Sequence, residues 1–255
     1  MFERKPWSEL GLLRMIIVGV FVLAIPIALI TTTVRVAVSE KALYDYSVRN
    51  YGAERASGIP ESALIGANGQ IRDYLVSPVT GPLAITLAND RASTTPLFSA
   101  KETAHMADVR SLVQLAFKVQ VISVALMLTL AVAMIVLWPT RVLAAASLRG
   151  GLLTAGVIAA GGALAMTGFS GAWSLFHQIA FTNNLWELNP LTDHLIQMYP
   201  EAFWQDIVTA LGAFLMVQAL GLTALSAAYL VLTPEKSNGI DARALPHSAR
   251  PVTPN

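Results

Sequence analysis

The sequence predicts an all-α integral membrane protein with four transmembrane helices and a small extracytoplasmic cap formed by the first outer loop. Two observations predict this class. Of the 255 residues, 55% are hydrophobic and 13% are charged, with a mean hydropathy of +0.57, whereas soluble domains carry about 25% charged residues. Charged residues are also absent from four stretches, each long enough for a span of about 20 residues, namely 15–34, 119–140, 150–186 and 207–234.

Residues 1–36 are expected to hold the N-terminal segment and the first transmembrane helix. The basic start at Arg4 and Lys5, followed by an apolar run, superficially resembles a signal peptide. The run is longer than the apolar region of a signal peptide, which has 7–15 residues, and only a weak small-residue cleavage site follows it. We therefore expect an uncleaved membrane anchor.

Residues 37–111 are predicted to form the cap. We expect residues 37–51 to continue the first helix, and Gly and Pro at 58–60 to break the chain before a helix over 61–76. The stretch 77–97 is rich in Pro, Thr, Gly and Ser and predicts a loop with a strand pair around 83–87.

A capping box is predicted where the cap returns to the membrane. Ser99 is a good N-cap and Glu102 stands three residues later, so a helix is expected to run from here into the second span. The remaining segments are, in order, transmembrane helix 112–138, cytoplasmic turn 139–149, transmembrane helix 150–180, extracytoplasmic loop 181–205, transmembrane helix 206–232 and a disordered, Pro-rich cytoplasmic tail, 233–255. In the third span, glycines are expected to permit close helix packing, at Gly151, Gly156, Gly161, Gly162 and Gly168.

The charges of the short loops predict the orientation. Arg14 flanks the first span, and Arg141 and Arg149 lie in the turn 139–149, which has no acidic residue. The loop 181–205 has three acidic residues and no Lys or Arg. By the positive-inside rule, both termini are expected in the cytoplasm and the cap outside.

Net charge and cysteine content exclude some classes of function. A net charge of +1 argues against a nucleic-acid partner. The absence of cysteine excludes a disulfide framework, a thiolate nucleophile and thiolate metal sites.

His105 and His177 are the candidate catalytic residues, because both fall just outside spans at the same membrane face. A helix from Gly150 to His177 is about 40 Å long and the hydrocarbon core is about 30 Å thick, so His177 is expected at the outer boundary. Imidazole both accepts and donates protons near neutral pH. By contrast, His194 is interpreted as a loop residue and His247 belongs to the tail.

Two carboxylates accompany His105 on the same predicted helix. Glu102, His105 and Asp108 follow at i, i+3 and i+6, so neighbouring members share a face. A carboxylate beside an imidazole can fix its tautomer, and the alternative interpretation is that Glu102 and Asp108 are solvated or capping groups.

The two histidine regions carry a family resemblance. The first reads F-x3-E-x2-H-x2-D-V from Phe98, and the second reads F-H-x3-F from Phe176, followed by W-x-L-x-P-x2-D-x-L-I-x3-P-x2-F-W from Trp186. With the four-helix layout, these blocks resemble the lipoprotein intramolecular transacylase (Lit) family over about residues 10–232.

The resemblance implies a membrane acyltransferase of the bacterial cell membrane. The family acts on diacylglyceryl-modified lipoproteins among the membrane lipids and moves the sn-2 acyl chain to the α-amino group of the N-terminal cysteine, giving a lyso-form lipoprotein. No cofactor or metal is implied. The family's catalytic histidines correspond to His105 and His177, and the matching positions with a supporting role are Glu102, Asp108, Phe176 and Asp193.

Acid–base catalysis by two histidines suits this reaction, because an amine must lose a proton and a glyceryl oxygen must gain one. Candidate donors to the developing oxyanion are Asn183, Asn184, Tyr44 and Tyr51.

Two other classes stay open. A metal-dependent lipid hydrolase would use ligand-type side chains such as Glu102, His105, Asp108 and His177, although no H-E-x-x-H signature is present. A scaffold or transporter without enzymatic activity would not need the histidines, and a transporter would usually show polar or broken spans.

Overall fold

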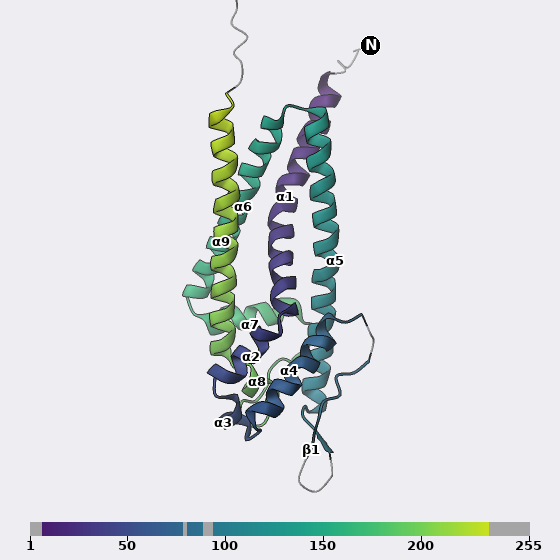
Figure 1. The fold of residues 1–255 in the computed structure, drawn as a ribbon, viewed down its shortest axis with the longest axis vertical. Helices are drawn as coiled ribbons and strands as arrows, with labels where there is room; N and C mark the ends of the chain where they lie inside the picture. Colours follow the sequence, from purple (N-terminus) through teal and green to yellow (C-terminus); the bar gives the residue numbers. More distant parts are fainter. Residues whose placement is uncertain (1–6, 79–80, 89–93, 235–255) are drawn as a thin grey trace, which may run out of the picture.

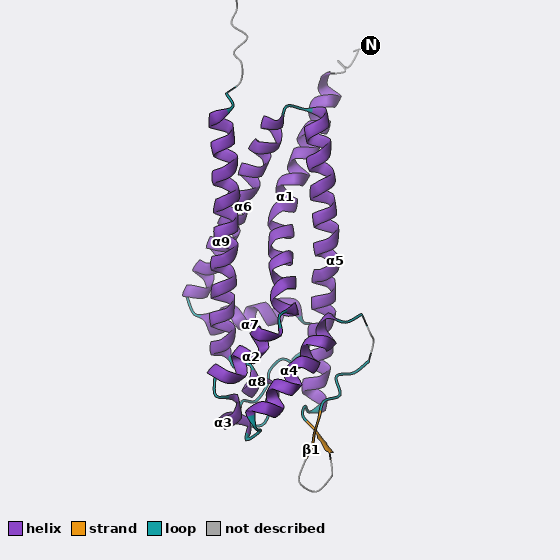
Figure 2. Ribbon diagram, in the orientation of Figure 1, coloured by secondary structure: helices purple, strands orange, loops and turns teal. Residues whose placement is uncertain are grey.

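Four long helices form a bundle, and the short elements gather at one of its ends (Figures 1 and 2). The computed structural model describes residues 7–78, 81–88 and 94–234. The bundle helices are long and apolar enough to cross a membrane, and they are α1 (Trp7–Ser39), α5 (Ala100–Leu137), α6 (Thr140–Met166) and α9 (Glu201–Leu232). The predicted all-α integral membrane class with four spanning helices is confirmed.

Glycines bring α6 close to its neighbours within the bundle. A Cβ atom at Gly151 would lie 2.9 Å from the carbonyl oxygen of Ala219, and one at Gly150 would lie 2.3 Å from a side-chain carbon of Ile25. Both distances are shorter than van der Waals contact, so only glycine permits this approach of α6 to α9 and α1. The predicted packing role holds for Gly151, whereas a Cβ at Gly156, Gly161 or Gly162 would meet nothing within 4 Å.

The segment expected as one helix over 150–180 is broken in two. After α6 ends at Met166, Gly168 adopts φ 147° and α7 (Phe169–Ala180) begins. This φ lies in a region that favours glycine, which explains a break that apolar periodicity cannot reveal. At its other end, α6 already starts at Thr140, so most of the expected turn 139–149 is helical.

Within the described residues, three short helices and one hairpin come from the first outer loop, and a fourth short helix comes from the segment 181–205. The expected helix 61–76 is confirmed, whereas the expected continuous helix to residue 51 is interrupted at Glu40, whose ψ of 109° ends α1. The strands pair antiparallel with Leu87 opposite Thr95. The bounds are α2 (Lys41–Asn50), α3 (Ala53–Ser57), α4 (Glu61–Val76), β1 (Thr86–Ala88), β2 (Thr94–Pro96) and α8 (His194–Met198).

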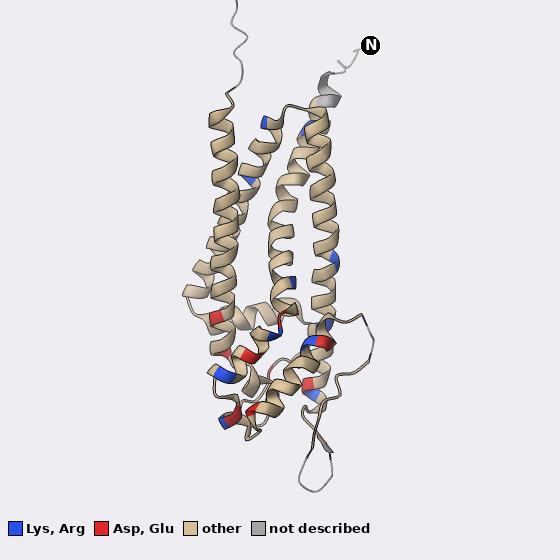
Figure 3. Ribbon diagram, viewed as in Figure 1, with Lys and Arg blue, Asp and Glu red and all other residues tan. Residues whose placement is uncertain are grey.

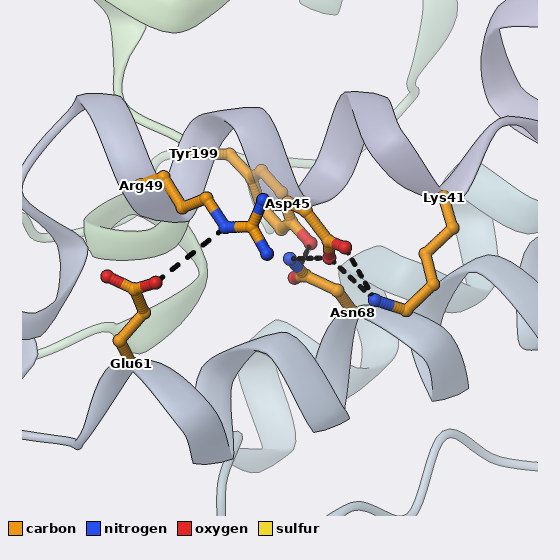
Figure 4. A network of polar contacts seen from close by, with 6 residues as sticks. All are labelled: Lys41, Asp45, Arg49, Glu61, Asn68 and Tyr199. Atoms are coloured by element: carbon orange, nitrogen blue, oxygen red, sulfur yellow. Dashed lines mark hydrogen bonds and ion pairs between the residues drawn. The ribbon is translucent and has the colours of Figure 1, made fainter.

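A buried polar network joins α2, α4 and the segment after α8 (Figure 4). Asn68 is fully buried; its amide donates to Asp45 at 3.1 Å and accepts from the Tyr199 hydroxyl at 2.7 Å. Lys41 pairs with the same Asp45 at 2.6 Å. Burial raises the pKa of Tyr199 well above its usual value, so the hydroxyl stays a donor. The network fixes the register of the cap helices around their apolar core, which includes Leu64, Ile71, Leu97, Met198 and Phe203.

Charged residues distribute unevenly along the molecule (Figure 3). The ribbon positions of Asp and Glu lie at the cap end, whereas those of Lys and Arg lie at both ends of the bundle. The last twelve residues before the charge-free part of α5 include Asp108, Arg110 and Lys118. The first turns of α5 therefore project beyond the apolar span into the cap. The expected tail 233–255 lies outside the described residues except for its first two positions.

Candidate active site

The N-terminus of α5 is fixed by the predicted capping box. The Ser99 hydroxyl accepts from the Glu102 backbone N–H at 3.3 Å, and the Ser99 backbone N–H donates to the Glu102 carboxylate at 2.8 Å. One turn later stands His105, which projects from the rigid beginning of a long helix.

His105 and His177 meet where the cap joins the bundle. Their ring centroids are 6.1 Å apart, with an interplanar angle of 35°. Only 6% of His105 and 7% of His177 is exposed. The first lies on α5 and the second on α7, so the break at Gly168 is what directs α7 toward α5. The sequence placed both histidines at one end of the spans, and the fold brings their rings together.

Aromatic rings surround the two imidazoles. Phe181 lies beside both, with its ring centroid 5.2 Å from that of His105 and 5.7 Å from that of His177. The ring centroids of Trp173 and Trp186 lie 4.6 and 5.0 Å from that of His177. These aromatic rings form the walls of the histidine site.

The hydrogen bonds of the two imidazoles differ. His177 Nδ1 lies 2.8 Å from the carbonyl oxygen of Trp173. A carbonyl can only accept, so Nδ1 carries the proton and the Nε2 lone pair of the neutral ring stays available. His105 Nδ1 is buried and has no hydrogen-bond partner among the described residues.

Burial sets the protonation of both imidazoles. It lowers the pKa of His177, an effect that the Trp173 carbonyl partly opposes. It also lowers the pKa of His105, which lies ahead of the apolar span; the proximity of His177 lowers it further and Asp108 raises it. Both rings are therefore neutral at pH 7, the form that accepts a proton.

Among the described residues, the Glu102 carboxylate forms hydrogen bonds with backbone groups and none with His105. Its side chain is 1% exposed, and its second carboxylate oxygen accepts from the Leu195 backbone N–H at 2.7 Å. Both oxygens thus accept backbone donors, one at the start of α5 and one in α8. Of the two interpretations of Glu102, the capping one holds, and this carboxylate ties the helix that carries His105 to the 181–205 segment.

Asp108 lies beside the site without a hydrogen bond to either imidazole among the described contacts. Its carboxylate accepts from the Asn183 amide at 2.9 Å. Phe176 contacts the His177 ring at 5.2 Å and remains 44% exposed. Asp193 stands at the N-cap of α8 but does not cap it; its carboxylate accepts from the Asn189 backbone N–H at 2.7 Å.

The other candidate donors have separate partners. The hydroxyl of Tyr44 donates to the carbonyl of Val38 at 2.7 Å, and that of Tyr51 to Asp206 at 2.5 Å. His194 Nδ1 donates to the carbonyl of Leu97 at 2.6 Å. His247 lies outside the described residues. Within the described part of the chain, no three His, Asp or Glu side chains gather in a geometry that could hold a metal ion.

Comparison with known families decides the assignment. A profile of the lipoprotein intramolecular transacylase Lit matches residues 19–204, most of the chain. The chain belongs to the Lit family. It is therefore an acyltransferase of the intramolecular transacylase type.

Solved structures agree with this assignment at the level of the fold. Lit from Bacillus cereus superposes with a TM-score of 0.74 at 19% identity, over 87% of this chain and 97% of that one. Two histidine variants of the same Bacillus cereus protein superpose with TM-scores of 0.71 and 0.72 at 18% identity, over 89% of this chain and 95% and 98% of theirs. No curated protein sequence matches the chain.

Two features of this Lit-family site could not be found from the sequence. One is the bond from His177 to the carbonyl of Trp173, four residues earlier, because a main-chain acceptor carries no sequence signal. The other is Trp186, whose contact with His177 depends on how the loop after α7 folds back. The spacing F-H-x3-F around Phe181 was the only signal of an aromatic wall.

Proposed function

We propose that this chain transfers the sn-2 acyl chain of a diacylglyceryl-cysteine lipoprotein to the α-amino group of that cysteine, leaving a lyso-form lipoprotein. The observation that carries the proposal is the meeting of His105 and His177, from helices far apart in sequence, at a 6.1 Å ring separation. Membership of the Lit family supplies the class of substrate.

The reaction is an oxygen-to-nitrogen acyl shift. The α-ammonium first gives up one proton to the medium, and the free α-amine then attacks the sn-2 ester carbonyl, so a C–N bond forms and the nitrogen loses its second proton. The tetrahedral intermediate then expels the glyceryl oxygen, which takes a proton as the C–O bond breaks. One base and one acid therefore balance the reaction, each contributing about 10²–10⁴ in rate, and no covalent enzyme intermediate is needed.

The environment of His177 suits the role of base. Its Nδ1 proton is held by the Trp173 carbonyl at 2.8 Å, which leaves Nε2 to accept the amine proton and stabilises the imidazolium that results. The imidazolium that His177 becomes then gives this proton to the glyceryl oxygen, directly or through the neighbouring ring of His105, so both rings begin and end the reaction neutral. The aromatic walls exclude water, which would otherwise hydrolyse the ester.

The positions of the two reacting groups favour intramolecular transfer. Donor ester and acceptor amine belong to one substrate molecule, so holding them in the right geometry removes a large entropic part of the barrier, up to about 7–11 kcal/mol for well-oriented pairs. The site needs only to bring them together and move two protons.

We also propose that both termini lie in the cytoplasm and that the histidine site faces the extracytoplasmic side of the bacterial cell membrane. Arg14 lies near the start of α1, and Arg141 and Arg149 lie near the start of α6. Both helix starts are at the end of the bundle opposite the cap, where no position is coloured as acidic (Figures 1 and 3). The positive-inside rule then places that end in the cytoplasm.

The first test is mass spectrometry of a lipoprotein's N-terminal peptide. The chain is expressed in a bacterial host that makes only diacylglyceryl lipoproteins, beside the variants His105→Gln, His177→Gln and His194→Gln. We expect N-acyl, S-monoacylglyceryl cysteine with the unaltered chain, and its loss in the first two variants. The third variant is the matched control, because His194 bonds a backbone carbonyl away from the two rings.

The products also separate the alternative functions. A lyso product without N-acylation would indicate a hydrolase. Unmodified diacylglyceryl cysteine, with the chain present at normal membrane levels, would refute the transacylase and favour a non-enzymatic role.

A further inference from the structure

A cavity of about 270 Å³ lies beside the histidine pair. Phe181, which contacts both imidazoles, forms part of its wall, so the cavity lies next to the histidine pair. One part of its lining is polar, with Asp108, Thr182 and Asn183, and another is apolar, with Leu112 and Leu115. An amphiphilic ligand fits such a lining better than a purely polar or purely apolar one.

The α5 residues that line the cavity continue the helix face that carries His105, and this face runs from the cap toward the apolar span. His105, Asp108, Leu112 and Leu115 recur at intervals of three and four residues, which places them along one helix face. Asp108 stands about 4.5 Å further along the helix axis than His105. Leu115, 55% exposed, lies at the far end toward the bilayer. The carboxylate is thus at the level of the histidines, and the apolar end points into the lipid.

The carboxylate of Asp108 is held in place without a positive partner. Its Oδ2 accepts from the Asn183 amide at 2.9 Å, and the Asn183 carbonyl accepts in turn from the Leu185 backbone N–H at 3.0 Å. Among the residues that the structure describes, none forms an ion pair with Asp108. A half-buried carboxylate so oriented and lacking a cation is suited to bind one.

We propose that Asp108 binds the α-ammonium group of the substrate cysteine in this cavity, beside the histidines. This inference rests on the proposed function, in which the substrate carries a free α-amine. The contact delivers the amine one helical turn from His105, and the apolar residues Leu112 and Leu115 receive the hydrocarbon part of the same molecule. N-acylation turns the ammonium into a neutral amide, so the product loses the contact and the site favours substrate over product.

The alternative is a positioning role, in which Asp108 orients the ring of His105. That role requires a hydrogen bond between the carboxylate and the ring, and His105 Nδ1 has no partner among the described residues. The two roles also differ in their readout, because an orienting residue does not distinguish a substrate with an amine from one without it.

The test measures binding of two probes to the full chain in detergent micelles at neutral pH. One probe is a diacylglyceryl-cysteine peptide with a free α-amine, and the other is its deamino analogue, in which hydrogen replaces the amine. A His177→Gln background prevents turnover. We expect the amine probe to bind about 10- to 100-fold more tightly, as for a hydrogen bond to a charged group, and the preference to fall to near one in Asp108→Asn.

Two further variants make the result interpretable. Glu187→Gln removes one exposed negative charge from the same loop and should keep the preference. Asn183→Leu removes the amide that holds the carboxylate and should reduce the preference even if Asp108→Asn folds poorly. A preference retained in both Asp108→Asn and Asn183→Leu, or absent with Asp108 in place, overturns the assignment. If the wild-type chain does not convert the amine probe at all, it is the proposed function that fails.

Discussion

Glu102, His105 and Asp108 stand one turn apart on α5, yet each side chain has a different set of contacts. Glu102 is buried and accepts two backbone N–H groups, His105 contacts the ring of Phe181, and Asp108 accepts from Asn183. Helical spacing places all three near one region, but the neighbours that fold against each position decide its role. The motif therefore combines a structural tie, a candidate catalytic group and a candidate binding group.

Replacing Glu102 should lower the free energy of unfolding, because its carboxylate accepts two backbone N–H groups in the folded chain. In Glu102→Gln, an amide NH₂ faces a backbone N–H, so one buried donor loses its acceptor at a cost of about 1–3 kcal/mol. We expect a lower thermal unfolding midpoint in detergent than for wild type. Glu54→Gln, at an exposed position of α3, is the control, and equal midpoints for the two variants would contradict the role of Glu102 as a buried tie.

The two imidazoles should titrate below the ordinary histidine value of 6.5. Burial disfavours the imidazolium, so each pKa moves down and each ring stays neutral until the pH falls below 6.5. NMR of the chain with isotope-labelled histidine, in zwitterionic lipid nanodiscs, measures the titration directly. His105→Gln and His177→Gln assign the two signals, and a midpoint above 6.5 for either would refute the burial argument.

The position of His177 depends on the residue at which α7 begins and on the direction that the helix takes from there. It begins directly after Gly168, whose φ of 147° turns the chain away from the direction of α6. In a lipid environment every backbone polar group needs a partner, so a break of this kind is tolerated where it lies at the cap junction. The third span is thus a shorter helix followed by an element that belongs to the site.

Substitution of Gly168 should impair transfer with little loss of folded protein. A Cβ at this φ is strained by about 1–3 kcal/mol, and relaxation would rotate α7 and move His177 away from His105. We expect Gly168→Ala to lower the acyl-transfer rate by about 10- to 100-fold, the order of loss that a misplacement of 1 Å causes. Gly171→Ala, where an added Cβ meets nothing within 4 Å, should retain the rate.

At the scale of the whole molecule, the cap closes one end of a lipid-spanning bundle and the site lies at their junction. The cap has an apolar core of its own and a buried polar network around Asn68 (Figure 4). The bundle relies on close approaches such as that at Gly151. Histidines at this junction reach ester and amine groups near the lipid–water boundary while acyl chains remain in lipid.

The proposed orientation can be tested because the chain has no native cysteine. Ser62→Cys lies on an exposed position of α4 in the cap, and Pro139→Cys lies on an exposed position between α5 and α6 at the other end. In intact spheroplasts, a membrane-impermeant maleimide should label the first, and the second only after permeabilisation. The reverse pattern would invert the proposed topology.

The sequence by itself determined the number of spans, the capping box at Ser99, the helix over 61–76 and the choice of His105 and His177 as candidate residues. Each of these follows from local physics: charge-free length, cap chemistry and apolar periodicity. Boundaries hidden inside uniformly apolar sequence did not follow, such as the break at Gly168, because periodicity does not register a single residue with an unusual φ.

Only the tertiary structure decided which groups contact one another. The hydrogen-bond partner of His177 is a backbone carbonyl, and those of Glu102 are backbone N–H groups. Trp186, in the loop after α7, contacts the His177 ring because that loop folds back toward it. Backbone acceptors and loop geometry leave no residue-type signature, so spacing alone cannot reveal them. The cavity beside Asp108 exists because the end of α7 and the chain that follows it lie beside the first turns of α5.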